Sequence, residues 1–290
     1  AIVEETHGSK LDVPATRERL LDAWRSGEAQ AVAQMQTVVP TTSAQNLRHI
    51  GVSQILTRFS SYFDPAQEGR VSNIRTAAGL LNGLVLGADE EFSFNTVVGP
   101  RTLERGFHVA PEIINQEMVP GVGGGVCQVS STLYNVALLT GLDIIERRNH
   151  SRPLGYMGIG RDATVYYGAI DLRFRNSLPV PLVFSTEVAD NRLTIAVSSS
   201  VTLPVEHAVV TEEPEIISPN TIIENDESLP PHETVVVKEG QPGWAVNTWL
   251  VTSGFDGQEL HRKFVARSIY PPQATVLRQN LVSGSSSSVL

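Results

Sequence analysis

The stretch GVGGGVCQVSSTLYNVALLTG (residues 121–141) joins a glycine-rich loop to an apolar run. Four apolar residues of this run recur at helical spacing: Val129, Leu133, Val136 and Ala137. Gly141 is typical of the residue that ends a helix. We therefore expect a helix after Cys127, with its apolar face packed against antiparallel strands in the strand-rich stretch 163–197.

Cys127 is the only cysteine of the 290 residues, and it lies where this glycine loop meets the helix. Unpaired N–H groups at a helix start favour negative charge, so a thiol there loses its proton more readily. In this interpretation Cys127 is a nucleophile and His150, in RRNHSRP (147–153), is its base. The alternative is that Cys127 only fills space, as buried cysteines often do.

Two carboxylates are further candidates for chemistry. Glu90 precedes the aromatic segment FSFN (92–95), where Phe92 or Phe94 could desolvate its carboxyl, raise its pKa and make it a general acid. Asp162, between Arg161 and an expected strand, is the reserve acid. The seven histidines are scattered without ligand spacing, and the P-loop lysine is absent, so we predict neither a metal site nor a cofactor.

Helical patterns come first in the middle of the chain and strand patterns later, which predicts an α+β fold: a central domain of helices and antiparallel sheet, then a small all-β module. An acidic, proline-broken stretch after residue 203 separates the two, so we expect few contacts between them. The Asp256-Gly257 pair predicts a hairpin turn in the β-rich module. We predict four parts: 1–46, the end of a small α+β module; 47–202, the central domain; 203–275, the β-rich module; and 276–290, a flexible tail.

Composition excludes several classes of protein. Hydrophobic residues make up 41% and charged residues 18%, enough for real cores. The formal net charge of −9 argues against nucleic acid as a partner. No run reaches the ~18 apolar residues of a membrane span, and no secretory signal is present. We expect a leader or anchor upstream of residue 1.

Four motifs together resemble the VanW family, a bacterial cell-surface family, over residues 50–197. They are RVSNIRTAA (70–78), EEFSFNTVVGPR (90–101), GGGVCQVSSTLYNVALLTGLDIIERRNHSRP (123–153) and GRDATVYYGAIDLRFRN (160–176). The front piece, 11–39, resembles the end of a peptidoglycan-binding module. The tail resembles a five-glycine surface module. These resemblances imply an extracellular or cell-wall location and peptidoglycan glycan strands as the partner.

Three functions compete under this resemblance. The favoured one is a lytic transglycosylase that cleaves glycan strands with a single carboxyl, Glu90, as acid and base. Six residues then bind the sugar: Asn95, Gly123, Gly124, Gly125, Gln128 and Arg161. The second is Cys127-dependent acyl transfer on peptidoglycan stem peptides with His150 as base. The third is a non-catalytic cell-wall binding or scaffold protein.

Overall fold

The computed structural model describes residues 2, 4–40, 42–114 and 117–281. The chain divides into two compact units, one ending at Ser53 and one beginning at Gln54. Its helices and antiparallel sheets confirm the predicted α+β class.

The first unit has two strands and two helices: β1 (Gly8–Leu11), α1 (Val13–Ser26), β2 (Met35–Val38) and α2 (Ala44–Ile50). Asp12 caps α1 by accepting a hydrogen bond from the N–H of Ala15, and Gly27 ends the helix in the left-handed region at φ 78°. β1 and β2 pair antiparallel. The unit thus contains both helix and strand, as an α+β module does. The resemblance of this unit to a peptidoglycan-binding module stays a prediction.

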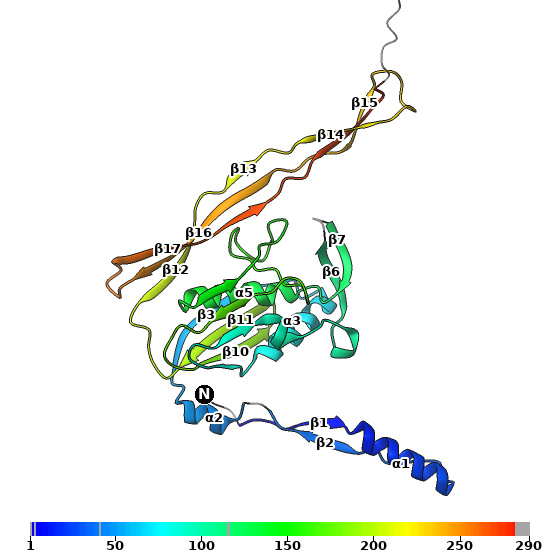
Figure 1. The fold of residues 1–290 in the computed structure, drawn as a ribbon, viewed down its shortest axis with the longest axis vertical. Coiled ribbons are helices and arrows are strands. Elements are labelled where there is room, and N and C mark those ends of the chain that lie inside the picture. The colour runs from blue at the N-terminus through cyan, green and yellow to red at the C-terminus, as the bar shows by residue number, and fades with distance from the viewer. Residues whose placement is uncertain (1, 3, 41, 115–116, 282–290) are drawn as a thin grey trace, which may run out of the picture. The chain divides into compact units, whose positions relative to one another are not determined.

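The second unit is built on a four-stranded antiparallel sheet in the order β3-β11-β10-β4 (Figure 1). Its strands are β3 (Gln54–Tyr62), β4 (Val85–Leu86), β10 (Leu182–Ala189) and β11 (Arg192–Ser199). α3 (Glu68–Leu81) packs against β10, and α5 (Val126–Leu139) packs against β3 and β11. The four predicted core residues of α5 are fully buried. The expected packing of this helix on the later strands is confirmed.

Smaller elements surround this core. β5 (Glu91–Ser93), β9 (Arg173–Arg175) and β8 (Asp143–Glu146) form a three-stranded sheet, and β6 (Val109–Ile114) and β7 (Glu117–Val122) form a hairpin. α4 (Phe94–Val98) and a short 3-10 helix, Leu103–Arg105, lie between β5 and β6 in the chain. The strand expected at 164–168 is absent: Tyr166 makes only an isolated bridge to Ile170 around a turn.

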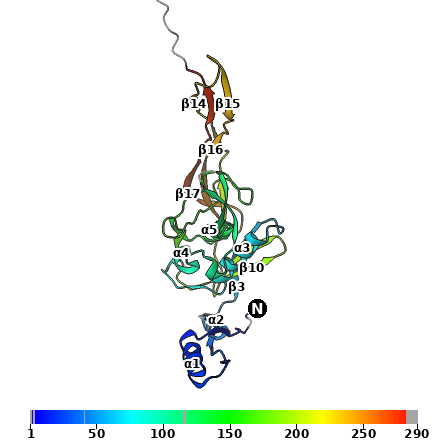
Figure 2. The same ribbon diagram turned by 90° about the vertical axis from the view of Figure 1, so that its right-hand side faces the viewer.

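The remaining elements up to residue 281, where the described part of the chain ends, are all strands: β12 (Glu206–Thr211), β13 (Glu215–Ile217), β14 (Thr221–Asn225), β15 (Thr234–Lys238), β16 (Gly243–Ser253), β17 (Glu259–Tyr270) and β18 (Thr275–Gln279). β16 and β17 form a long hairpin whose turn holds Gly257 at φ 78°, as the Asp256-Gly257 pair predicts (Figures 1 and 2). The small all-β module is therefore present.

We expected few contacts between this β module and the core, and that expectation is wrong. Leu250 of β16 belongs to the same buried apolar cluster as Leu133 of α5, and β12 packs against α5. Thr248 donates a hydrogen bond to the carbonyl of Gly160 at 3.1 Å. The acidic stretch after residue 203 suggested a loose connection, but Leu250 of β16 enters the core that α5 helps to form. The two parts therefore share one.

Candidate active site

The start of α5 places Cys127 in a half-buried position. Gly125, in the left-handed region at φ 105°, is the residue before the helix, so Cys127 lies in its first turn. Its neighbours along α5 are buried, and the thiol lies 3.5 Å from the carbonyl oxygen of Val165. The first turn of a helix carries a partial positive charge, which stabilises a thiolate.

His150 and Asp162 extend from this thiol as a hydrogen-bonded chain. Both lie in the segment between β8 and β9, and both are buried, with 8% and 2% of their surface exposed. A side-chain hydrogen bond joins Cys127 to the His150 ring. The Nδ1 atom of the ring lies 2.6 Å from Oδ2 of Asp162. Since Nδ1 is taken, Nε2 is the ring nitrogen left for the thiol.

Asp162 is held on all sides. Its Oδ2 also accepts a hydrogen bond from the backbone N–H of His150 at 2.7 Å. Its Oδ1 accepts from Nη2 of Arg147 at 3.2 Å and from the hydroxyl of Tyr270. Four donors for one carboxylate fix its orientation and favour its charged form.

These contacts shift the pKa values of Cys127, His150 and Asp162. Burial alone raises the pKa of the Cys127 thiol, but its polar and charged surroundings, chiefly the hydrogen bond and the charge of His150 together with the charge of Arg101, lower that pKa on balance. Burial lowers the pKa of His150, whereas its hydrogen bonds to Asp162 and Cys127 raise it, with a net value of about 9. Burial opposes ionisation of Asp162, but His150 and Arg147 hold its pKa below the usual range. His150 and Asp162 are therefore charged, and they shift the Cys127 thiol towards its thiolate form.

Two arginines flank the thiol. Arg70 of α3 stacks 5.4 Å over the ring of Tyr156 and donates to Gln128 Oε1 at 2.7 Å. Arg101 donates through Nη1 to Asn95 at 2.7 Å, while its Nη2 is buried and lacks a hydrogen-bond partner among the described residues. Both positive charges act on Cys127 and Arg101 contributes to its lowered pKa. The surroundings of the thiol therefore favour negatively charged groups.

The glycine loop does not leave open space for a sugar above Gly124. A Cβ atom on Gly124 would lie 2.5 Å from the carbonyl oxygen of Pro111, and one on Gly125 would lie 2.8 Å from Cγ of Arg70. A Cβ on Gly123 would lie 3.0 Å from Arg101. The glycines are therefore needed because the β6 backbone and the two flanking arginines pack against them.

The surroundings of Glu90 differ from those expected of a general acid. Its side chain is exposed, and its carboxylate accepts a hydrogen bond from the N–H of Gly87 at 2.7 Å. Phe92 and Phe94, expected to desolvate it, are buried in the core. The expectation of a partly dry Glu90 in a groove is wrong because alternation along β5 directs Phe92 inward and leaves Glu90 in the turn.

The other expected sugar-binding residues are occupied by internal contacts. Gln128 is fully buried, and its amide donates to Ser61 and to the carbonyl of Tyr62. Arg161 donates to Asn135, two turns along α5 from the thiol, and stacks 5.0 Å over Phe59. Asp162 cannot serve as a reserve acid in this setting, because its partners hold it as a carboxylate.

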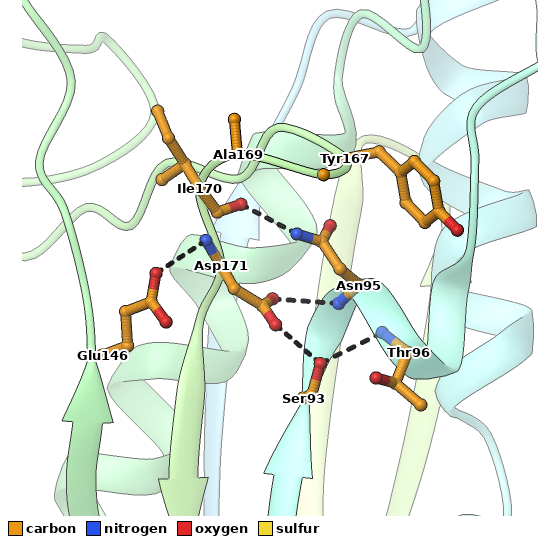
Figure 3. A pocket seen from close by; sticks show the side chains of 9 residues that line it. Ser93, Asn95, Thr96, Glu146, Tyr167, Ala169, Ile170 and Asp171 are labelled. Atoms are coloured by element: carbon orange, nitrogen blue, oxygen red, sulfur yellow. Dashed lines mark hydrogen bonds between the residues drawn. The ribbon is translucent and has the colours of Figure 1, made fainter.

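Asn95 lines an open pocket of about 440 Å³ beside α4 (Figure 3). Its Nδ2 donates to the carbonyl of Ile170 at 2.9 Å, and its Oδ1 accepts from Arg101. Asp171 accepts from the Ser93 hydroxyl and the Asn95 N–H, while the ring of Tyr167 stands at the edge (Figure 3). Arg101 also stacks 5.9 Å from the Tyr167 ring, although neither Arg101 nor Cys127 lines this pocket.

No helix in the described part of the chain is long and apolar enough to cross a membrane. Within the same residues, no group of three or more histidine, cysteine, aspartate or glutamate side chains is placed to hold a metal ion.

Sequence reasoning paired Cys127 with His150 but missed the role of Asp162 and the contribution of Tyr270. His150 and Asp162 lie in one segment without regular structure. Their spacing there was the available signal for the role of Asp162. No local signal pointed to Tyr270, which lies 108 residues away from Asp162 in the sequence.

Comparison with known proteins gives two family matches. A model described as VanW like protein matches residues 69–198, and a G5 domain model matches residues 207–280. Two solved G5 structures, HP0197-G5 and the IgA1 protease G5 domain, are 20% and 21% identical. They cover 25% and 26% of this chain and 96% and 89% of their own, with TM-scores of 0.19 and 0.21.

Two curated relatives are similar in sequence. The uncharacterized protein YoaR of Bacillus subtilis (strain 168) is 37% identical over 201 residues, which cover 69% of this chain and 66% of YoaR. The vancomycin B-type resistance protein VanW of Enterococcus faecalis (strain ATCC 700802 / V583) is 36% identical over 115 residues, 38% of this chain and 42% of that protein. The chain thus spans just under two thirds of the first relative and less than half of the second.

Proposed function

We propose that this chain, a VanW-family protein in which a VanW-like domain precedes a G5 domain, acts at the bacterial cell wall as a thiol acyl-transfer enzyme on peptidoglycan stem peptides. One observation carries the proposal: the buried chain of hydrogen bonds from Cys127 through His150 to Asp162. A cysteine that merely fills space needs no such partners.

The three residues take the roles of nucleophile, acid–base and orienting carboxylate. The Cys127 thiolate attacks the carbonyl carbon of a stem-peptide amide. His150, as imidazolium, gives its proton to the departing amine, which leaves a thioester on Cys127. An amine from a second stem, or water, then attacks the thioester while His150 takes the proton back, and the thiolate is released. Asp162 holds the ring in place through Nδ1.

The charges around the thiol support stem peptides rather than neutral sugar as the substrate. Arg70 and Arg101 both act on Cys127, and Nη2 of Arg101 has no hydrogen-bond partner among the described residues. Stem peptides carry free carboxylates, which guanidinium groups bind well. We assign Arg101 to a substrate carboxylate, with Asn95 holding the arginine in position.

Two earlier hypotheses stay as predictions with less support. Glycan cleavage by a lytic transglycosylase needs a proton-donating carboxyl in a groove, and exposed Glu90 does not meet that need. A non-catalytic wall-binding protein needs no activated thiol. The G5 domain is compatible with an enzyme and with a non-catalytic binding protein, because we propose that it holds the chain on cell-wall polysaccharide in both cases.

The experiment incubates the full chain with purified sacculi and identifies the soluble and residual products by mass spectrometry. Changes in stem-peptide composition or cross-linking that are lost in Cys127→Ala support the proposal. Anhydro-muropeptides that persist in Cys127→Ala and vanish in Glu90→Gln would favour glycan cleavage instead. Binding to sacculi with unchanged products from both variants would support the scaffold hypothesis.

A further inference from the structure

We infer that Tyr270, the last residue of β17 in the G5 domain, is a positioning residue for the thiol centre: it orients Asp162 and thereby His150 and Cys127. The VanW-like domain then lacks a complete centre without its neighbour. This inference rests on the proposed function, and it goes beyond it by giving the G5 domain a part in the chemistry.

The two oxygens of Asp162 face different parts of the molecule. Oδ2 faces His150, with hydrogen bonds to its backbone N–H at 2.7 Å and to Nδ1 at 2.6 Å. Oδ1 faces the G5 domain and accepts from the hydroxyl of Tyr270. Tyr270 is 1% exposed and its hydroxyl also accepts from the N–H of Gly160 at 2.9 Å. The phenol is therefore fixed between the Asp162 carboxylate and the loop that carries it.

The end of β17 holds this segment at two further points. Ser268 accepts a hydrogen bond from Nη1 of Arg147 at 2.7 Å, and Nη2 of the same guanidinium donates to Oδ1 of Asp162. The Asn149 amide donates to the carbonyl of Ile269 at 2.8 Å. Of the two donors to Oδ1 of Asp162, Tyr270 belongs to β17 and Arg147 is hydrogen-bonded to Ser268 of β17.

This arrangement affects the protonation of the thiol, not only packing. Burial and the negative charge of Asp162 raise the pKa of Tyr270, so the phenol stays protonated and donates. Without that donor the carboxylate gains freedom to rotate away from Nδ1, and the imidazolium that stabilises the thiolate is held less firmly. The apparent pKa of Cys127 then rises towards that of an ordinary thiol.

Other titratable and charged groups also face the centre, and they remain in place when Tyr270 is changed. They are Arg70 from α3, Arg101 after α4, Tyr134 from α5, Arg147 after β8 and Tyr156 between β8 and β9. A difference between wild type and a Tyr270 variant therefore reports on the single hydroxyl.

The test measures the rate of iodoacetamide alkylation of Cys127 against pH in the full chain, without any substrate. Tyr270→Phe keeps the ring and removes the donor. Its alkylation midpoint should rise by about half a pH unit to one pH unit, the worth of one hydrogen bond. Ser268→Ala, which frees Arg147, should shift the midpoint in the same direction by less, and it replaces Tyr270→Phe if that variant does not fold.

Thr248→Val is the matched control, because Thr248 is equally buried in the same sheet and donates to Gly160 without touching Asp162. Its midpoint should equal that of wild type. A low wild-type midpoint that stays unchanged in folded Tyr270→Phe, or that shifts equally in Thr248→Val, overturns the inference and leaves the proposed function standing. A wild-type midpoint at the value of an ordinary thiol overturns both.

Discussion

Cys127, two residues after Gly125, and Glu90, three residues after Gly87, both lie at the start of a helix or strand, yet their surroundings differ. The Glu90 carboxylate finds its partner three residues away, at the N–H of Gly87, and remains exposed. Cys127 is half-buried and bonded to His150, which in turn is bonded to Asp162. The hydrogen bond between Glu90 and nearby Gly87 only completes a turn. In contrast, buried partners that are distant in sequence lower the pKa of Cys127. This difference favours the thiol as the reacting group.

The largest effect is expected from removal of the nucleophile. Cys127→Ala should reduce changes in stem peptides to background, because no other described side chain is bonded to His150 in a position to attack. Cys127→Ser keeps the size but offers a much weaker nucleophile, so it should retain at most a trace of activity. Mass spectrometry of treated sacculi measures both. Substantial activity in folded Cys127→Ala would show that the thiol is not the reacting group.

Asp162→Asn should have the next largest effect. Loss of the orienting carboxylate should lower kcat by about 10²- to 10⁴-fold, as in other triads. Acylation needs the imidazolium, which is present below the pKa of His150, about 9, and is lost above it. Because the carboxylate helps to raise that pKa, the alkaline limb of the kcat profile should move to lower pH in Asp162→Asn. An unmoved limb with reduced kcat would assign Asp162 to folding alone.

Arg101→Gln should have an intermediate effect. Loss of one charge-assisted hydrogen bond to substrate should raise KM about 10- to 100-fold with a smaller change in kcat. Arg161→Gln is the matched control, since Arg161 is also half-buried but its hydrogen-bond partner is Asn135, two turns along α5 from the thiol. Kinetics on soluble stem-peptide fragments would separate the two. Equal effects of both variants would show that Arg101 contributes only to packing.

Glu90→Gln should have the smallest effect. An exposed side chain with one local hydrogen bond contributes little, so the free energy of unfolding should change by less than about 0.5 kcal/mol. Activity should stay within about twofold of wild type on the same reasoning. Thermal unfolding and the sacculus assay measure the two quantities. A complete loss of activity with normal stability would restore the glycan-cleavage hypothesis.

The sequence predicts those features of the fold that depend on residues close together in the chain. Helical spacing identified the buried face of α5, and Asp256-Gly257 identified the β16–β17 turn. The same pattern could not show that Leu250 enters the core of the preceding domain, because an acidic linker indicates composition and not packing.

The site was predictable in part for the same reason. A helix start and a histidine in one motif were enough to pair Cys127 with His150. The role of Asp162 depends on Tyr270, and the surroundings of Arg101 include the thiol and Tyr167, both distant from it in sequence. Buried networks of this kind are set by tertiary structure, so single-residue reasoning favoured Glu90 by its aromatic neighbours alone.

Trapping of the covalent intermediate tests the central claim most directly. The full chain is mixed with stem-peptide fragments, quenched in acid, and digested for mass spectrometry of the peptide that contains Cys127. The account predicts an added mass equal to the acyl part of the fragment, removed by hydroxylamine and absent from Cys127→Ala. Turnover of the fragments with Cys127 unmodified at every quench time, and undiminished turnover in Cys127→Ala, would contradict it.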